Sequence, residues 1–243
     1  MERIAIISDI HGNMTALRAV LADIEERGIT RIMNLGDLAG KGPDGDQAID
    51  LCRKICEVNV RGNWDEDLAR GVASPWATPV QEQLGPERRA WLGALPFSYD
   101  FTFGGKGIRL LHTSPQGLSH RVPQRGDDDA KLAMFETTEH TDPDFIPDVV
   151  GCGDIHTTYI RTFHNKILFN AGSVGNPLDL TMAAYAILES GGASLGLSIV
   201  RVPYDIDAEL QRARESGMPG YAEYAWELTT GLYRLAMPTT VSE

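Results

Sequence analysis

The stretch IAIISDIHGN, residues 4–13, decides the fold. It begins with four β-prone apolar residues, Ile4 to Ile7, and continues at once into a polar segment that contains aspartate, histidine and glycine. A short apolar run of this kind is typical of a strand that is buried on both faces of a parallel sheet. The polar residues that follow indicate a ligand site at the carboxyl end of this strand.

The pattern continues outward from this strand as an alternation of helices and strands. Residues 15–27 carry a helical apolar stripe that ends at Gly28, and residues 31–35 form a second apolar run. Residues 47–56 predict a second helix, and residues 58–60 predict a third strand. This order predicts a parallel sheet with right-handed crossovers.

The second half of the chain is richer in strands, and an isolated helix is predicted at residues 130–139. The predicted strands are residues 98–103, 108–111, 149–152, 159–163, 167–170, 183–188 and 195–202. A parallel half joined to a hairpin-rich half predicts an α/β fold with two packed mixed sheets. We therefore expect a four-layer α/β/β/α sandwich that forms a single domain over residues 1–243, with a metal site at the C-terminal ends of the strands.

Two segments flank this predicted sandwich. Residues 71–95 are rich in Pro, Gly, Trp and Ala and predict short helices over one edge, either as a small cover that shapes the substrate pocket with Trp76 and Trp91 or as plain apolar packing. Residues 205–243 predict C-terminal helices, at 206–215 and 221–233. Their aromatic residues are typical of a core or a dimer interface, so a homo-oligomer stays open.

Composition restricts the function classes. The 243 residues are 42% hydrophobic and 23% charged, as in ordinary folded proteins. The net charge of −12 disfavours extended nucleic acid as a partner, and no apolar run approaches the ~20 residues of a membrane span. The N-terminus lacks a signal-peptide core, so a cytoplasmic location is expected. The odd number of cysteines, with Cys52 and Cys56 one turn apart, predicts buried thiols; a metal or redox pair is the alternative.

Side chains that bind metals follow several of the predicted strands. They are Asp9, His11, Asp37, Asn63, His112, Asp154 and His156. One such residue alone is typical of a turn or a helix cap. Together, at the carboxyl ends of strands, they predict convergence at one sheet edge. Oxygen and nitrogen ligands suit Mn, Fe or Zn better than Ca. Two cations repel each other, which favours a shared carboxylate, and Asp37 after the middle strand is the natural bridge.

These segments, in this order, resemble the calcineurin-like metallophosphoesterase superfamily. The matching motifs are Asp9-Ile10-His11, Gly36-Asp37, Gly62-Asn63-Trp64-Asp65, His112 and Gly153-Asp154-Ile155-His156. Residues 170–177, NAGSVGNP, resemble a turn of the small prokaryotic YfcE-like phosphodiesterase branch, and residues 202–205 before a helix are similar to that branch too. The resemblance covers nearly the whole chain.

The resemblance implies a dinuclear-metal phosphoesterase that hydrolyses a small phosphorylated substrate, a phosphodiester rather than a phosphomonoester, with a metal-bridging hydroxide. The cofactors would be two divalent or trivalent transition-metal ions, Mn, Fe or Zn. Asp9, His11 and His156 would hold the first ion. Asn63 and His112 would hold the second, with Asp37 as the bridge. The residues expected to be catalytic are Asp37, Asn63 and His112.

Two departures from the family pattern concern Trp64 and Asp154. Trp64 stands where many relatives have the histidine that protonates the leaving group, and an indole cannot supply that proton. Asp154 replaces a histidine that binds the second metal in relatives; a carboxylate is a competent ligand for Mn or Fe. We expect the site to bind two ions nonetheless.

Two further residues are candidates for substrate binding. Arg61 presents a fork of donors that suits phosphate oxygens, and its alternative role is a surface salt bridge to Asp65. Asn13 follows the first strand and could contact phosphate, although a helix begins just beyond it and an N-cap is the alternative.

Two other functions stay open beside the enzyme. One is a non-catalytic protein-binding scaffold with a degraded metal site, as in the retromer scaffold subunit that resembles these enzymes. The other is a nuclease of the same superfamily, which the acidic composition disfavours.

Overall fold

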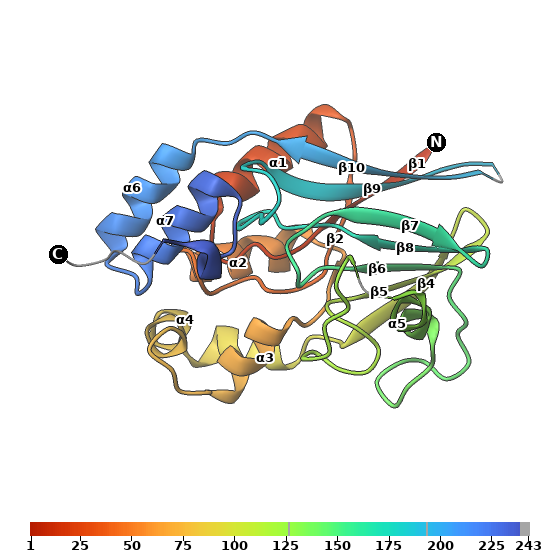
Figure 1. The fold of residues 1–243 in the computed structure, drawn as a ribbon, viewed down its shortest axis with the longest axis horizontal. Coiled ribbons are helices and arrows are strands. Elements are labelled where there is room, and N and C mark those ends of the chain that lie inside the picture. The colour runs from red at the N-terminus through yellow and green to blue at the C-terminus, as the bar shows by residue number, and fades with distance from the viewer. Residues whose placement is uncertain (126, 193, 239–243) are drawn as a thin grey trace.

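Two five-stranded sheets pack face to face in the computed structural model, which describes residues 1–125, 127–192 and 194–238 (Figure 1). The first sheet has the order β10-β9-β1-β2-β3, and the second has the order β4-β5-β6-β8-β7. The first comprises β1 (Glu2–Ile7), β2 (Arg31–Asn34), β3 (Val58–Asn59), β9 (Ala183–Gly191) and β10 (Ser194–Val202). The second comprises β4 (Ser98–Phe103), β5 (Lys106–Leu111), β6 (Val149–Cys152), β7 (Tyr159–Phe163) and β8 (Lys166–Asn170).

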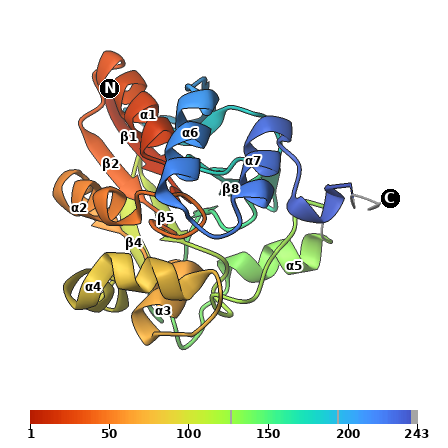
Figure 2. The same cartoon turned by 90° about the vertical axis from the view of Figure 1, so that its left-hand side faces the viewer.

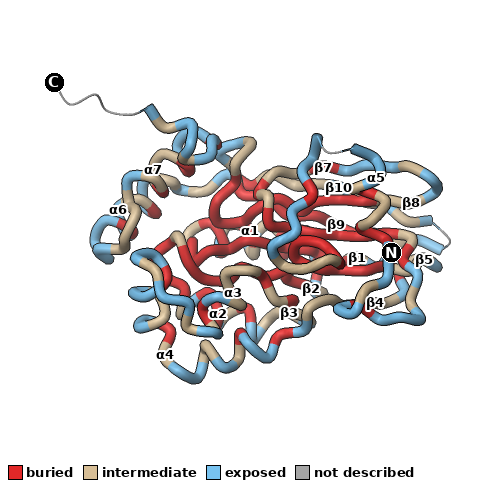
Figure 3. Tube along the Cα trace, turned by 60° about the horizontal axis from the view of Figure 1, so that its bottom comes forward, coloured by how far each residue is buried: buried red, intermediate tan, exposed pale blue. Residues whose placement is uncertain are grey.

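Strand β1 occupies the centre of the first sheet and is buried on both faces. It pairs in parallel with β2, with Ile6 opposite Met33, and antiparallel with β9, with Ile6 opposite Ala186. Because side chains alternate along a strand, Ile4 and Ile6 enter the apolar layer between the two sheets, whereas Ala5 and Ile7 face the helices. This double burial confirms the interpretation of residues 4–7, and Figure 3 shows the continuous buried stretch along β1 and its neighbours.

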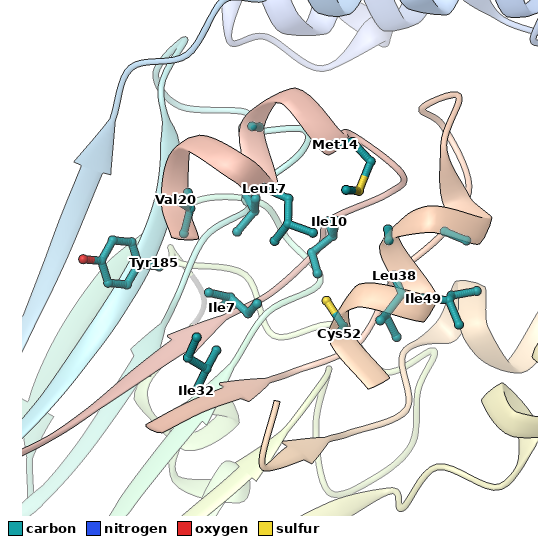
Figure 4. Packing of buried hydrophobic residues seen from close by; sticks show 14 of the residues in the cluster. Ile7, Ile10, Met14, Leu17, Val20, Ile32, Leu38, Ile49, Cys52 and Tyr185 are labelled. Atoms are coloured by element: carbon teal, nitrogen blue, oxygen red, sulfur yellow. The ribbon is translucent and has the colours of Figure 1, made fainter. Parts of the chain in front are cut away.

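Helices cover the outer faces of both sheets. They are α1 (Met14–Glu26), α2 (Gly45–Ile55), α3 (Asn63–Arg70), α4 (Ala77–Gly93), α5 (Asp128–Leu132), α6 (Ile206–Ser216) and α7 (Tyr221–Thr230), with the 3₁₀ turns η1 (Ala133–Phe135) and η2 (Arg234–Ala236). Leu17 of α1 and Ile49 of α2 pack with Ile7 in one apolar cluster (Figure 4). On the other side, Met134 and Phe135 cover Leu168 of the second sheet. The predicted α/β/β/α layering is confirmed.

Two of the predicted helices below differ from the structure in their bounds, and the segment 71–95 agrees with its prediction. The helix predicted at 130–139 begins at Asp128, because the Asp127 side chain caps it, and passes into η1. The helix predicted at 221–233 ends at Thr230, because Gly231 adopts the left-handed conformation that stops helices. The short helices predicted within 71–95 are confirmed as the two halves of α4, which are separated by non-helical backbone at Gly85; α4 packs on α2 and α3.

Two further sequence predictions concern the thiols and the membrane. Cys52 and Cys152 are buried free thiols, as predicted, and Cys56 is a half-buried free thiol. Among the described residues, none of the helices is long and apolar enough to cross a membrane.

Glu209 of α6 ties three helices together at the C-terminal end of the fold, where Figure 2 shows α6 beside α1 and α7. Its completely buried carboxylate accepts hydrogen bonds from Thr15 Oγ1 of α1 at 2.7 Å and from Tyr224 Oη of α7 at 3.0 Å. Burial raises the pKa of Glu209 above its usual value of 4.5, although the hydrogen bonds from Thr15 and Tyr224 oppose this.

The raised pKa of Glu209 predicts a pH-dependent stability. The stabilising contribution of the neutral carboxyl is complete below pH 4.5 and is lost as the pH rises through the folded-state pKa. Glu209→Gln, which is neutral throughout, should therefore gain in melting temperature relative to the wild type as the pH rises from 4 to about 8. Thermal unfolding of both proteins across this range measures the difference, and a constant difference would contradict the prediction.

Candidate metal centre

The carboxyl ends of five strands, which belong to both sheets, bring the predicted metal ligands together in one largely buried cluster. Asp9 and His11 follow β1, and Asp37 follows β2. His112 follows β5, and Asp154 and His156 follow β6. Asn63 is the first residue of α3, directly after β3. Asp9, His11 and His112 are completely buried, so the sheets themselves form the wall of the site.

The backbone at this cluster lies in an uncommon conformation. Positive φ angles occur at Asp9, His11, Asp37, Asp154 and His156. Such angles are costly for residues other than glycine and persist mainly where function requires them. Among the described non-glycine residues, the others with positive φ are Lys41 and the β-hairpin residues His164 and Asn165. Every ligand in this conformation was predicted from sequence; Lys41 was not.

One group of ligands consists of Asp9, His11 and His156. One ligand atom from each lies within 4.8 Å of the other two. His11 Nε2 and His156 Nε2 are 3.1 Å apart, and Asp9 Oδ1 lies 3.2 Å from His156 Nε2. Two nitrogen ligands of one ion, each about 2.0 to 2.1 Å from it, lie roughly 3 Å apart. The group therefore has the spacing of a first metal site.

A second group consists of Asp9, Asp37 and His112, with the same mutual limit of 4.8 Å. Asp37 Oδ2 lies 3.6 Å from His11 Nε2 of the first group and 3.5 Å from His112 Nε2. Asn63 Oδ1 lies 3.1 Å from His112 Nε2. Asp37 thus lies between the histidines of the two groups, and Asp9 also reaches both.

Hydrogen bonds outside the cluster orient the ligands. His112 Nδ1 faces the carbonyl oxygen of Leu35 at 2.7 Å, and His156 Nδ1 faces that of Asn176 at 2.5 Å. A carbonyl oxygen accepts a hydrogen bond from the protonated Nδ1, which leaves the Nε2 lone pair for a metal. The Trp64 amide donates to Asp37 Oδ1 at 2.9 Å and so turns the other oxygen of Asp37 inward.

The charges and unsatisfied atoms of the cluster fit a bound cation. Asp9 Oδ1 and His11 Nδ1 are buried and have no hydrogen-bond partner among the residues that the structure describes. Burial and the nearby Lys41 lower the pKa of His11 to about 3, which keeps this imidazole neutral and able to bind a metal. Although burial opposes it, Asp37 and Asp9 raise the pKa of His112 well above its usual range. The buried carboxylates of Asp9 and Asp37 therefore favour a positive charge beside them, and metal ions would supply that charge.

Asp154 lies at the edge of the cluster. Its Oδ1 is 4.0 Å from His112 Nε2, and both its oxygens accept hydrogen bonds from Arg121 Nε, at 3.1 and 2.8 Å. Burial raises the pKa of Asp154 above its usual value, although His112 and Arg121 oppose this. The structure thus places Asp154 beside the second ligand group. It also pairs Asp154 with the guanidinium of Arg121, a contact that the sequence did not indicate.

The two predicted substrate-binding residues occupy different surroundings. Asn13 is completely buried; its Oδ1 accepts the amide of Ala16, and its Nδ2 donates to the Gly175 carbonyl, so the N-cap alternative is confirmed and the side chain does not reach the opening. Arg61 is partly exposed in a surface hollow that Asn63 also lines. Its Nε pairs with Glu66 at 3.2 Å, so the predicted pairing with Asp65 is wrong.

The side chain of Asp65 faces the protein interior, where its carboxylate accepts hydrogen bonds from backbone amides. It accepts the amides of Asp37 at 2.8 Å, Gly62 at 2.9 Å and Leu38 at 3.1 Å. A Cβ on Gly62 would lie 2.1 Å from Asp37 Oδ1, so only glycine allows this approach. Asp65 therefore has a structural role, because it holds the backbone of both turns.

A cavity of about 340 Å³ forms the opening of the metal centre. Besides ligands, its walls contain Lys41, Trp64, Arg121, Leu178 and Tyr233. Sequence reasoning missed Lys41, Arg121 and Tyr233 as residues of the site. Trp76 lines a neighbouring pocket and Trp91 packs against the core, so the segment 71–95 does not supply the walls of the opening.

Comparison with known proteins gives the family. A family model described as the calcineurin-like phosphoesterase superfamily domain matches residues 2–192. The chain belongs to this superfamily. The match contains every ligand described above and confirms the resemblance seen in the motifs; α6 and α7 lie beyond it.

Similar proteins support this membership of the superfamily. The uncharacterized protein MJ0912 of Methanocaldococcus jannaschii is 29% identical over 249 residues, which cover 89% of this chain and 93% of that protein. A metallophosphoesterase from Sphaerobacter thermophilus has a TM-score of 0.78 at 25% identity and covers 95% of this chain and 99% of its own. The hypothetical protein PH1004 of Pyrococcus horikoshii has a TM-score of 0.78 at 20% identity, with 94% and 98% coverage, and shares the fold.

Proposed function

We propose that this chain is a metal-dependent phosphoesterase that uses two transition-metal ions, Mn, Fe or Zn, to hydrolyse a small phosphodiester, with phosphomonoesters as poorer substrates. One observation carries the proposal: Asp37 Oδ2 lies 3.6 and 3.5 Å from histidine nitrogens of two adjacent ligand groups. That arrangement supports a pair of ions rather than one.

The metal ions, when bound, would activate water and stabilise the negative charge that develops on the phosphoryl oxygens. The residues of the chain prepare the site for this. Asp9, His11 and His156 would hold one ion, and His112 and Asn63 the other, with Asp154 at its edge. The oxygen and nitrogen donors suit Mn, Fe and Zn. Arg121 is exposed at the opening, where its guanidinium would attract a phosphate.

The buried ligands also favour catalysis over the scaffold alternative. A protein that only bound partners would gain nothing from keeping two carboxylates and three imidazoles desolvated without full hydrogen bonding, because such burial is costly. Trp64 and Asp154, the two departures from the family pattern, leave these five side chains in place.

A metal and activity assay tests the proposal. The protein should bind transition metal and hydrolyse bis(4-nitrophenyl) phosphate with Mn²⁺ present, faster than it hydrolyses 4-nitrophenyl phosphate. A strong chelator should abolish turnover, and Mn²⁺ should restore it. Turnover of neither ester by protein that carries metal would overturn the proposed function, and binding of less than one transition-metal ion per chain would overturn the metal pair.

A further inference from the structure

Lys41 and Trp64 line two adjacent hollows. One is the opening of the metal centre. The other, here called the apolar pocket, is walled by Trp76, Val80, Met218 and Tyr224 among others. The side chain of Lys41 is only 11% exposed, so its ammonium is a desolvated cation beside the metal ligands.

The backbone at Lys41 has the same left-handed conformation as the backbone at several predicted metal ligands. Lys41 has a φ of 58°, which it shares in sign with five predicted metal ligands. Gly40 before it has a φ of 94°, and a Cβ there would lie 2.4 Å from the Trp64 ring. Trp64 therefore packs onto Gly40 and, edge-on, against His11, at 5.9 Å between ring centroids. The left-handed backbone at Gly40 and Lys41, together with the Trp64 ring, fixes the position of Lys41 at the opening of the metal centre.

The Lys41 ammonium makes a hydrogen bond to a neutral side chain, whereas the carboxylate of its ion pair lies beyond hydrogen-bond distance. Its Nζ donates to Asn176 Oδ1 at 2.6 Å and lies 3.8 Å from Glu227 Oε2 of α7. Burial lowers the pKa of Lys41; Glu227, Asp9 and Asp37 oppose this, and Arg234 near η2 adds to it. A desolvated ammonium gives up its proton more readily than one in water.

Few side chains at the opening can supply a proton. The indole of Trp64 and the guanidinium of Arg121 do not release theirs near neutral pH. Tyr233 lies on the outer side of the opening and is 42% exposed. Lys41 is the buried acid among the described residues of this opening that are not predicted ligands.

We propose that Lys41 is the general acid of the hydrolysis and protonates the leaving group. The inference rests on the proposed function. The oxygen of water bonds to phosphorus and releases one of its protons to solvent, the bond from phosphorus to the leaving oxygen breaks, and that oxygen keeps the electron pair. It takes a proton from the Lys41 ammonium, and the resulting amine regains a proton from solvent. The role needs no metal ligand to change its own bonding.

Leaving-group dependence tests this role, because a good leaving group departs without a proton. Lys41→Met keeps the length of the side chain and removes the acid. It should lower kcat/KM for diphenyl phosphate by about a hundredfold, the lower end of the usual range for acid catalysis, and for bis(4-nitrophenyl) phosphate by less than about threefold. Lys41→Arg, which keeps the charge but not the proton transfer, should show the same selective loss and serves if Lys41→Met does not fold.

Controls separate this role from structure and binding. Lys106→Met removes an exposed lysine of the second sheet and should leave both substrates unaffected. Metal content of the Lys41 variants should match the wild type, and their turnover is measured below the melting transition of each variant. Equal losses on both substrates, or none, would overturn the role of Lys41 while the proposed function stands. A wild type inactive on both diesters would overturn the proposed function itself, and the inference with it.

Discussion

Asp37→Asn is expected to lower kcat/KM for bis(4-nitrophenyl) phosphate by about a thousandfold, because the lost stabilisation amounts to several kcal/mol. Asparagine has the same shape but no charge. Its oxygen would stay with the Trp64 amide, which now donates to Asp37 Oδ1. Its NH₂ group would then face His11 and His112, where Asp37 Oδ2 now lies. A donor at that position repels cations, so metal content should fall together with turnover.

Asp67→Asn is the matched control for this change. Asp67 is an exposed carboxylate on α3, close in sequence to Asn63, and no ligand group contains it. The control should keep the activity and metal content of the wild type. An Asp37→Asn protein that keeps full metal content and loses less than tenfold in kcat/KM would contradict the bridging role of Asp37.

Much of the fold follows from local patterns in the sequence. The apolar run at 4–7 and the alternation over residues 4–60 predict the parallel strands β1, β2 and β3, since double burial demands continuous apolar residues. Residues 183–202 predict two strands, but not that β9 pairs with β1. Such pairing depends on contacts between residues far apart in the chain, which the periodicity of either strand does not contain.

The candidate site likewise contains residues that the sequence predicts and residues that only the structure shows. Asp9 and Asp37 follow β1 and β2, which are neighbouring parallel strands, so the topology of the first sheet gathers them at one edge. His156 follows β6 of the second sheet, and the packing of the two sheets, which the sequence pattern does not contain, brings it to the same place. Lys41 and Arg121 lie on loops, and their places depend on backbone angles and packing that only coordinates show. A signal for Lys41 existed in the sequence: a lysine between two glycines, four residues after Asp37, in a loop that the structure places at the ligands.

Asp65 shows how a residue that binds no metal can determine the geometry of the metal centre. Its carboxylate is completely buried and accepts three amides, from Asp37, Leu38 and Gly62. Two of these amides belong to the turn that carries the bridging carboxylate, and the third directly precedes Asn63. Burial and the nearby Asp37 raise the pKa of Asp65 to about 7. Burial of this carboxylate therefore costs free energy, and the hydrogen bonds from the three amides offset part of that cost.

Asp65→Ala should therefore damage stability and activity together. Three buried amides would lose their acceptor at a cost of about 1 to 3 kcal/mol each, so the free energy of unfolding should fall by about 3 kcal/mol or more. For a chain of this size that corresponds to a melting temperature lower by roughly 6 °C or more. Calorimetry measures the loss, and turnover below the melting transition should also fall, because the Asp37 and Asn63 turns are no longer held. Asp65→Asn keeps one oxygen and should lose less stability than alanine, whereas Asp67→Asn should lose none. An alanine variant that melts like the wild type would contradict the role of Asp65 in holding both turns.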